Sequence, residues 1–279
     1  MGNPSFGSMT MKTDIWLFSD LDRTILPNGK AQESTQARPL LKALAEMPRV
    51  HLVYVSGRHE GLLKKAIKEY QLPIPRYAIG DVGTTIYQPR SGAWQHWAAW
   101  EDEIGRDWHG RSHDELAALF EDLPELRLQE PEKQNLFKLS YYTEAEIDSR
   151  KLVAAMRRRL AEQEIRASII FSVDEMKEVG LLDVLPESAT KVHAIRFLLR
   201  HHVVSEQQMV YAGDSGNDLP VLTSGLQAVL VRNAREDVRE EALEGVQSKG
   251  LRDRLYLAQG GFLGLNCFYL PWVLEGVAH

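Results

Sequence analysis

The sequence predicts an α/β fold: a parallel sheet flanked by helices and interrupted by an inserted α+β domain. Short continuous apolar runs alternate with amphipathic runs of helical length, which is typical of a parallel sheet that is covered on both faces. The alternation occurs in two blocks, and the stretch between them has a different composition, with four tryptophans between positions 94 and 108. We therefore expect a core at 12–88 and 184–279, an insert at 89–183 and a flexible lead-in at 1–11.

Strands and helices alternate through each part of the chain. The periodicity of apolar residues separates the two types of element. The first block contains predicted strand regions at 15–20, 50–57 and 77–87 and predicted helices at 34–47 and 58–71. The second block contains strand regions at 181–186, 208–213 and 226–233 and a helix at 189–202. The insert contains strands at 138–144 and 165–174 and an amphipathic helix at 145–163.

Composition excludes several classes of protein before any motif is considered. Hydrophobic residues make up 44% of the chain and charged residues 26%, which is typical of a folded soluble protein, and the apolar runs are shorter than the roughly 20 residues of a membrane span. The net charge of −6, without a basic tract, argues against a nucleic-acid partner. The single cysteine, Cys267, cannot form an internal disulfide, so we expect a cytoplasmic protein. We expect the apolar segment 262–276 to pack on the sheet, with Pro271 ending or kinking it.

Polar side chains follow three predicted core strands at the point where each strand ends. The groups are Asp20, Asp22 and Thr24; Ser56, Gly57 and Arg58; and Asp214, Ser215, Gly216, Asn217 and Asp218. Doubly wound sheets bind ligands beyond the carboxyl ends of their strands, so these groups are expected to form one site. An Asp-x-Asp pair can alternatively be a turn or a helix cap, but that interpretation explains one group better than three.

The charges at this predicted site indicate a metal. Asp20, Asp22, Asp214 and Asp218 would bring up to four negative charges together, and such crowding requires a compensating cation. Carboxylate oxygens without cysteine or histidine favour Mg²⁺ over Zn²⁺. Lys191, at the start of a predicted helix, is either a second cation of the site or a solvated surface lysine.

Such a set of groups suits phosphoryl transfer, which depends on positioning and on charge neutralisation. Asp20, at the strand tip, suits a nucleophile that would form an aspartyl-phosphate. Asp22, one step into the loop, suits the acid/base that protonates the leaving oxygen and then activates water.

Four motifs in order resemble those of the haloacid dehalogenase (HAD) superfamily of phosphatases. They are "DLDRT" (20–24), "VSGR" (55–58), Lys191 and "GDSGND" (213–218). The insert resembles the C2B-type cap of the Cof-like subclass. Within that subclass the chain is most similar to sucrose-phosphate phosphatases and their relatives that act on disaccharide phosphates. The segments that carry this likeness are "GDVGTTIY" (80–87), "WQHW" (94–97), "EKQNLFKLSYY" (132–142), "LLDVLPESATK" (181–191), "VYAGDSGNDLPVL" (210–222) and "RNA" (232–234).

The resemblance implies a Rossmann-like core and assigns roles to single residues. Asp20 would be the nucleophile and Asp22 the acid/base. Asp214 would ligate Mg²⁺ together with Asp20 and the main-chain carbonyl of Asp22, with Asp218 close behind. The phosphate-binding residues would be Ser56, Gly57, Lys191 and Asn217. Two residues depart from the family pattern: Ser56 replaces a threonine, and Arg23 replaces a small or amide residue and could crowd or clamp the substrate entrance.

The resemblance further implies that the cap selects the leaving group. Expected substrate contacts are Gln134, Asn135 and Lys138 in the cap, together with Arg23 and Arg58; Gln134 and Asn135 could instead be solvated turn residues. The tryptophans at 94, 97, 100 and 108 could stack on a sugar, but we expect them to form the core of the cap. Arg157 to Arg159 are expected to form a solvated helix face, and His96 and His193 are expected to be structural.

The first functional hypothesis is an Mg²⁺-dependent sugar-phosphate phosphatase, with the insert as a mobile lid that excludes water. Candidate substrates are sucrose 6-phosphate, mannosylfructose phosphate and phosphorylated glucosyl-glycerol or glucosyl-glycerate compounds, supplied by a sugar-phosphate synthase acting upstream. Two alternatives remain: a mutase or phosphotransferase on the same scaffold, and a catalytically silent sugar-phosphate-binding domain.

Overall fold

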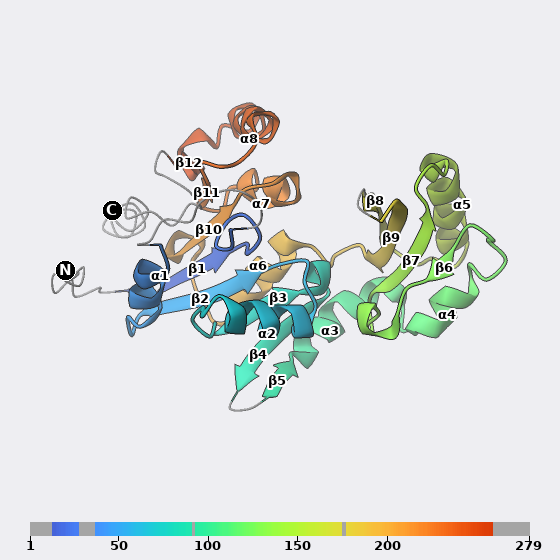
Figure 1. Ribbon diagram of the computed structural model, residues 1–279, viewed down its shortest axis with the longest axis horizontal. Helices are drawn as coiled ribbons and strands as arrows, with labels where there is room; N and C mark the ends of the chain where they lie inside the picture. Colours follow the sequence, from blue (N-terminus) through green and yellow to red (C-terminus); the bar gives the residue numbers. More distant parts are fainter. Residues whose placement is uncertain (1–12, 28–36, 91–92, 175–176, 259–279) are drawn as a thin grey trace. The chain divides into compact units, whose positions relative to one another are not determined.

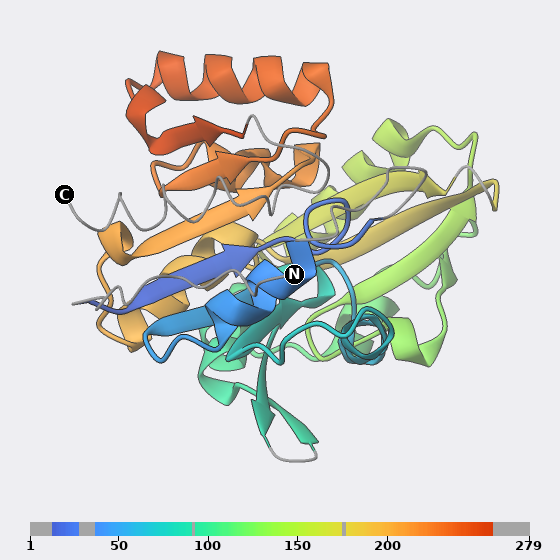
Figure 2. The same ribbon diagram turned by 60° about the vertical axis from the view of Figure 1, so that its left-hand side comes forward.

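The structure is a computed structural model that describes residues 13–27, 37–90, 93–174 and 177–258. The chain divides into two compact units, shown in Figures 1 and 2: a core unit, Met1–His96 with Lys191–His279, and an insert unit, Trp97–Thr190. The predicted lead-in at 1–11, Cys267 and the segment 262–276 lie outside the described residues.

The core unit is built on an eight-stranded sheet. In spatial order its strands are β12 (Leu255–Leu257), β11 (Ala228–Leu230), β10 (Met209–Gly213), β1 (Ile15–Ser19), β2 (Val50–Val55), β3 (Tyr77–Gly80), β4 (Thr85–Arg90) and β5 (Ala93–His96). The six strands from β12 to β3 are parallel, and β4 and β5 extend the sheet as an antiparallel hairpin. This arrangement confirms the predicted α/β class.

Helices cover both faces of this sheet (Figure 1). The helices of the core unit are α1 (Ala37–Ala45), α2 (Glu60–Glu69), α6 (Lys191–His201), α7 (Leu219–Leu222) and α8 (Glu236–Ser248). Buried residues of α1 and α2 belong to one apolar cluster with alternate residues of β1 and β2, such as Leu17 and Leu52. Trp16 points to the opposite face, where its ring contacts His202 directly after α6. Sheet and helices thus form the three layers that the alternation of elements predicted.

Chain order places a topological switch point at β1. From β1 the chain proceeds to β2 and β3 on one side, and after the insert it returns to β10 on the other side. Side chains that follow β1, β2 and β10 therefore meet at the carboxyl edge of the sheet, where such folds bind ligands.

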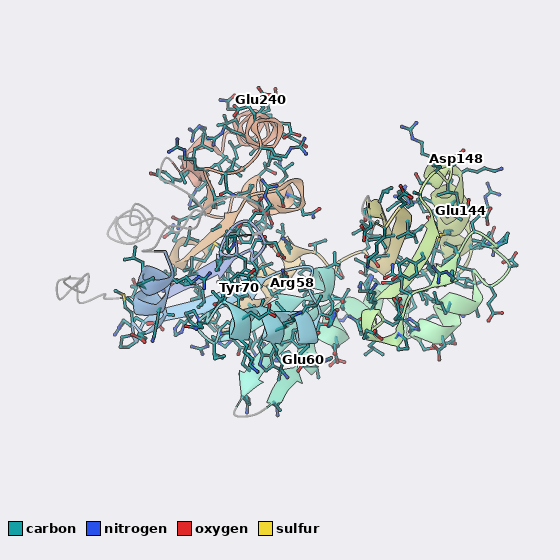
Figure 3. The ribbon with its side chains drawn as sticks, viewed as in Figure 1. Arg58, Glu60, Tyr70, Glu144, Asp148 and Glu240 are labelled. Carbon is teal, nitrogen blue, oxygen red and sulfur yellow. The ribbon has the colours of Figure 1, made fainter. Side chains whose placement is uncertain are left out.

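The insert unit is an α+β module. Its antiparallel sheet has the order β6 (Arg127–Leu128), β7 (Leu139–Glu144), β9 (Val179–Pro186) and β8 (Ala167–Asp174). Its helices are α3 (Ala98–Gly105), α4 (His113–Ala118) and α5 (Ser149–Glu162). The apolar face of α5 and one face of the sheet share a buried cluster, which includes Met156 and Leu182. Asp148 begins α5 as its N-cap, accepting a hydrogen bond from Lys151 N at 3.1 Å (Figure 3).

The limits of the two units differ from those predicted from the sequence. The insert was expected at 89–183, whereas the insert unit spans Trp97–Thr190. β5 was expected in the insert, but it pairs with β4 of the core sheet. The run Leu181–Pro186 was interpreted as a core strand, whereas it is part of β9 and pairs with β7 and β8. A short apolar run shows that a strand is buried but does not show in which sheet it lies, which explains the second difference.

The four clustered tryptophans are divided between the units. Trp100 and Trp108 are buried in the insert unit, as expected for a small core. Trp94 lies in β5 and packs against Tyr87 of the core unit, with ring centroids 5.8 Å apart, so its assignment to the core of the cap was wrong. Trp97 is partly exposed at the start of α3.

Several residues with expected structural roles can also be placed. Arg157 and Arg158 are exposed on α5, while Arg159 forms an ion pair with Asp122. His96 packs edge-on against Tyr87 in the β4–β5 hairpin.

In the described part of the chain, none of the helices has both the length and the apolar character that crossing a membrane would require.

Candidate active site

Three aspartates meet at the carboxyl edge of the core sheet. Asp20 follows β1, while Asp214 and Asp218 follow β10, the strand paired with β1 in parallel. A carboxylate oxygen from each of the three lies within 4.8 Å of the others, and all three residues are buried. A buried set of carboxylate oxygens at this spacing suits a hard divalent cation such as Mg²⁺.

Lys191 supplies a positive charge to the same group from the first residue of α6. Its Nζ donates to Asp20 Oδ1 at 3.2 Å and to Asp218 Oδ1 at 2.6 Å, and the side chain is 15% exposed. Of the two interpretations that the sequence left open, the structure supports a lysine of the site rather than a surface lysine.

Asp218 is fixed by hydrogen bonds from several donors. Its Oδ1 also accepts from the Tyr211 hydroxyl at 2.5 Å, and its Oδ2 accepts from Asp214 N at 3.0 Å and from the N and Oγ of Ser215 at 3.1 and 3.0 Å. The sequence analysis did not identify Tyr211, because a tyrosine inside a buried strand looks like a core residue.

Gly213 makes room for Asp218. A Cβ at position 213 would lie 2.6 Å from Asp218 Cγ and 2.7 Å from its Oδ2, which is closer than non-bonded atoms approach. Position 213 therefore requires glycine as long as Asp218 keeps its place.

Burial and charge shift the pKa values of these groups in different directions. Burial raises the pKa of Asp20 to about 7; Asp218 and Asp214 raise it as well, while Lys191 lowers it. Burial, with Asp218, raises the pKa of Asp214 to about 6, against the opposing effect of Arg23 and Lys191. Burial alone would raise the pKa of Asp218, but the charge and hydrogen bond of Lys191, together with hydrogen bonds from Tyr211 and Ser215, outweigh it, and the net shift is downward. The pKa of Lys191 is raised, because Asp20 and Asp218 outweigh its burial.

Asp22 lies beside this group, but its side chain interacts with Arg58. Nε and NH2 of Arg58 donate to Oδ2 and Oδ1 of Asp22 at 2.9 and 2.5 Å, a bidentate ion pair. Arg58, labelled in Figure 3, lies in the turn between β2 and α2, and its main-chain N donates to Ser56 Oγ at 3.2 Å. Arg58 thus orients the predicted acid/base, and its expected contact with the substrate stays a prediction. That the main-chain carbonyl of Asp22 binds the metal stays a prediction.

The segment "GDVG" supports the backbone of Arg58. Asp81 N donates to the carbonyl of Arg58 at 3.0 Å, and a Cβ at Gly80 would lie 2.8 Å from that same oxygen. Asp81 and Val82 both have positive φ, 51° and 59°, which is a strained conformation for residues that carry a Cβ. The two strained residues lie next to the predicted site, and the hydrogen bond from Asp81 N helps to hold the turn that carries Arg58.

Arg23 forms an ion pair with Asp214 across the site. Its Nε lies 3.2 Å from Asp214 Oδ2, and its NH2 donates to the main-chain oxygen of Asn233 at 3.3 Å. Asn233 in turn donates from Nδ2 to the carbonyl of Arg23 at 2.6 Å. Asn233 lies in the "RNA" segment, which the sequence analysis identified as similar to the family. Its contact with Arg23 was not predicted.

The remaining phosphate-site residues occupy the turns around this edge. Ser56 is buried directly after β2, and its N donates to Ile79 O at 2.8 Å. Gly57 and Asn217 are exposed in the turns that follow β2 and β10. Their contact with a phosphate stays a prediction.

In the insert unit, the three expected substrate residues have different environments. Gln134 donates from Nε2 to the carbonyls of Gln129 and Ser140 at 3.1 and 2.8 Å, and its Oε1 accepts from Ser140 N at 2.8 Å. Its amide is thus used within the fold. Asn135 Oδ1 accepts from Phe137 N at 2.9 Å and shapes a turn.

Lys138 has an acidic neighbour that the sequence analysis did not identify. Its Nζ donates to Lys133 O at 3.1 Å and lies 4.0 Å from Asp183 Oδ1. Asp183 also accepts a hydrogen bond from Ser140 Oγ at 2.5 Å. Asp183 lies in the run 181–186, which was interpreted as a strand of the core and crosses the expected end of the insert at 183, so its position beside Lys138 was not predicted.

A family model described as sucrose-6F-phosphate phosphohydrolase matches residues 13–264. The chain belongs to this family. The predicted likeness to sucrose-phosphate phosphatases of the HAD superfamily is therefore confirmed. The predicted enzyme class, a sugar-phosphate phosphatase, is thereby confirmed.

Several known proteins resemble the chain to different degrees. A protein of Nitrosococcus oceani described only as a HAD-like hydrolase is 55% identical over 96% of this chain and 72% of its own length. Sucrose-phosphatase 2 of Nicotiana tabacum is 28% identical over 82% of this chain, and the match spans about half, 53%, of the tobacco protein. The sucrose-phosphatase of Synechocystis sp. PCC6803, solved in complex with sucrose and phosphate, superposes with a TM-score of 0.70 at 25% identity, covering 94% of this chain and 98% of that one.

Proposed function

We propose that this protein hydrolyses the phosphate monoester of a disaccharide, through a phosphorylated Asp20. The observation that carries the proposal is the group formed by Asp20, Asp214, Asp218 and Lys191 at the switch point of the core sheet. A second support is the sucrose-phosphatase of Synechocystis, which shares this fold and was solved with sucrose and phosphate.

In the first step the carboxylate of Asp20 attacks phosphorus, and the bond between phosphorus and the sugar oxygen breaks. Asp22 gives its proton to that oxygen, so the sugar leaves as an alcohol. In the structure Arg58 holds both oxygens of ionised Asp22, so one of these two contacts must open when Asp22 carries the proton, and the other keeps the side chain in position. Lys191 and the hydroxyl of Ser56 are assigned to the phosphoryl oxygens.

In the second step Asp22, now ionised, removes a proton from water, and the resulting nucleophile attacks phosphorus. The bond between phosphorus and Asp20 breaks, inorganic phosphate leaves, and Asp20 is restored as a carboxylate. The same side chain thus serves as acid and then as base, which returns the protein to its starting state without any further reactant.

Asp20 and Asp214 would hold Mg²⁺ at this site together with the main-chain carbonyl of Asp22, with Asp218, whose two oxygens already accept hydrogen bonds from protein donors, close behind. When bound, the ion would offset the negative charge of the aspartates and of the phosphoryl group. The chemistry of the donor set supports this assignment, because three carboxylate oxygens converge within 4.8 Å.

For recognition of the sugar we assign Lys138 and Asp183 in the insert unit rather than Gln134. The ammonium group of Lys138 has three hydrogen-bond donors. One of them donates to the carbonyl of Lys133, and the carboxylate of Asp183 lies 4.0 Å away, so donors remain for sugar hydroxyls. Gln134 already uses its amide to hold β7 and the preceding turn. A mannosylfructose-phosphate phosphatase of Agrobacterium fabrum is 27% identical over 78% of this chain, so mannosylfructose phosphate is a candidate substrate beside sucrose 6-phosphate.

A panel of monosaccharide and disaccharide phosphates tests the proposal. Phosphate release with Mg²⁺ should favour one disaccharide phosphate, and it should vanish in Asp20→Asn. After rapid acid quenching, mass spectrometry of peptides should find a phosphoryl group on Asp20. Weak and equal turnover of every substrate would contradict the disaccharide assignment.

Analysis of the products separates the two alternatives. A mutase or phosphotransferase would return the phosphoryl group to a sugar, and a silent domain would bind a sugar phosphate without consuming it. The proposal requires free phosphate and free disaccharide in equal amounts.

A further inference from the structure

Arg23 has an unusual conformation for its residue type. Its backbone lies in the left-handed region, with φ of 60°, which glycine and asparagine tolerate better than arginine. The loop fixes this conformation: Arg23 N donates to Leu26 O at 2.9 Å, and Asn233 Nδ2 donates to Arg23 O at 2.6 Å. A residue held against its conformational preference beside a reaction site is a candidate for a functional role.

The guanidinium of Arg23 forms an ion pair with Asp214, one of the expected metal ligands. Its Nε lies 3.2 Å from Asp214 Oδ2, while Oδ1 of Asp214 accepts from Thr24 Oγ1 at 3.5 Å. Both oxygens of this carboxylate are therefore engaged by groups of the protein. Asp214 is 4% exposed and Arg23 is 47% exposed, so the arginine approaches the buried group from the solvent side.

Asn233 offers the guanidinium of Arg23 other acceptors than Asp214. The main-chain oxygen of Asn233 already accepts from Arg23 NH2 at 3.3 Å. The side-chain Oδ1 of Asn233 is buried and has no hydrogen-bond partner among the described residues. A buried acceptor without a partner is costly, and a donor that moved there would remove that cost.

We infer that Arg23 competes with Mg²⁺ for Asp214, leaving this carboxylate for Asn233 when the metal binds. This inference rests on the proposed function, because it assumes a metal bound to Asp20 and Asp214. A guanidinium and a divalent cation on the same carboxylate oxygen would repel each other, so the two arrangements exclude one another. Without metal, Arg23 neutralises a buried charge; with metal, it is a mobile cation at the edge of the site.

Calorimetric titration of the whole chain with Mg²⁺ alone, without substrate, tests the competition. Arg23→Gln removes the competing charge and keeps a side chain with the same backbone preference, so Mg²⁺ should bind about 5-fold more tightly, equivalent to ~1 kcal/mol. Arg23→Lys keeps the charge and should stay within about 2-fold of the wild type.

Arg58→Gln is the matched control. It also removes one positive charge close to Asp20, but from an arginine whose partner, Asp22, lies outside the group of three carboxylates. A general electrostatic effect would tighten Mg²⁺ binding equally in both glutamine variants, and that result would overturn the inference. Competition at Asp214 requires the larger change in Arg23→Gln.

A measurement on the wild type keeps the test valid if Arg23→Gln folds poorly. The Nε–H resonance of Arg23, assigned through its loss in Arg23→Lys, should shift when Mg²⁺ is added. An unchanged resonance at saturating Mg²⁺ would overturn the inference and leave the proposed function intact. If the wild type does not bind Mg²⁺ at all, the inference and the metal-dependent part of the proposed function both fail.

Discussion

Replacing Lys191 by methionine should destabilise the core unit, and the structure allows the size of the effect to be worked out. Nζ of Lys191 is within hydrogen-bond distance of two buried carboxylates, Asp20 and Asp218. Removing one partner of a buried ion pair costs about 3–5 kcal/mol, because the other charge stays buried without compensation. Methionine keeps most of the length of the side chain, so the loss measures the charge more than the packing.

The two aspartates should not be affected equally. Asp218 keeps the hydrogen bond from Tyr211 and those from the backbone and hydroxyl donors of the turn after β10. Asp20 loses the cation that opposes the effect of its burial. Only Asp20 is left as a buried carboxylate without compensation. We therefore expect the free energy of unfolding to fall by about 3 kcal/mol, the lower end of the range.

Urea unfolding followed by circular dichroism, with EDTA and then with Mg²⁺, measures this loss. Mg²⁺ should restore part of the stability of Lys191→Met, since a ligand that binds the folded state stabilises it. The control is Lys64→Met, which removes an exposed ion pair with Glu60 and should cost less than about 1 kcal/mol. Equal losses in the two variants would show that the carboxylates at the site do not depend on Lys191, and would refute the reasoning.

Two further substitutions test other parts of the site. Gly213→Ala places a Cβ against Asp218 and should cost about 1–3 kcal/mol in urea unfolding, whereas Gly216→Ala, where a Cβ meets nothing within 4 Å, should change stability by less than about 0.5 kcal/mol; similar losses would contradict the close-approach argument. Arg58→Lys removes the bidentate grip on Asp22 and should lower kcat by about 10- to 100-fold with little change in unfolding free energy, so an unchanged kcat would show that Arg58 does not position the acid/base.

The sequence was sufficient to predict the order and type of most core elements, because strand and helix periodicities are local. The helices predicted at 58–71 and 189–202 correspond to α2 and α6 with ends shifted by a few residues. Chain order also placed Asp20 and Asp214 at one edge of the sheet, since parallel strands end on the same side. This inference used topology rather than contacts, and it therefore needed no knowledge of side-chain packing.

The features that the sequence could not give depend on pairing across long separations. Whether Leu181–Pro186 joins the core sheet or the insert depends on which strands it meets, and a buried apolar run looks the same in both. The hydroxyl of Tyr211 is directed at Asp218 by the packing of β10, and nothing in a run of apolar letters signals such a partner. The bidentate grip of Arg58 on Asp22 was missed for the same reason, although both residues were already candidates.

The distribution of cations at the site explains which of them a metal could displace. Lys191 is 15% exposed and bonds two carboxylates from the start of α6, so moving it away would leave two buried charges. Arg58 serves Asp22, whose side chain is outside the group that a metal would occupy. Arg23 is 47% exposed, pairs with one carboxylate and already has a second acceptor in the main-chain oxygen of Asn233. The cost of removal is therefore smallest for Arg23, and a divalent cation that binds here should displace this arginine and leave the lysine in place.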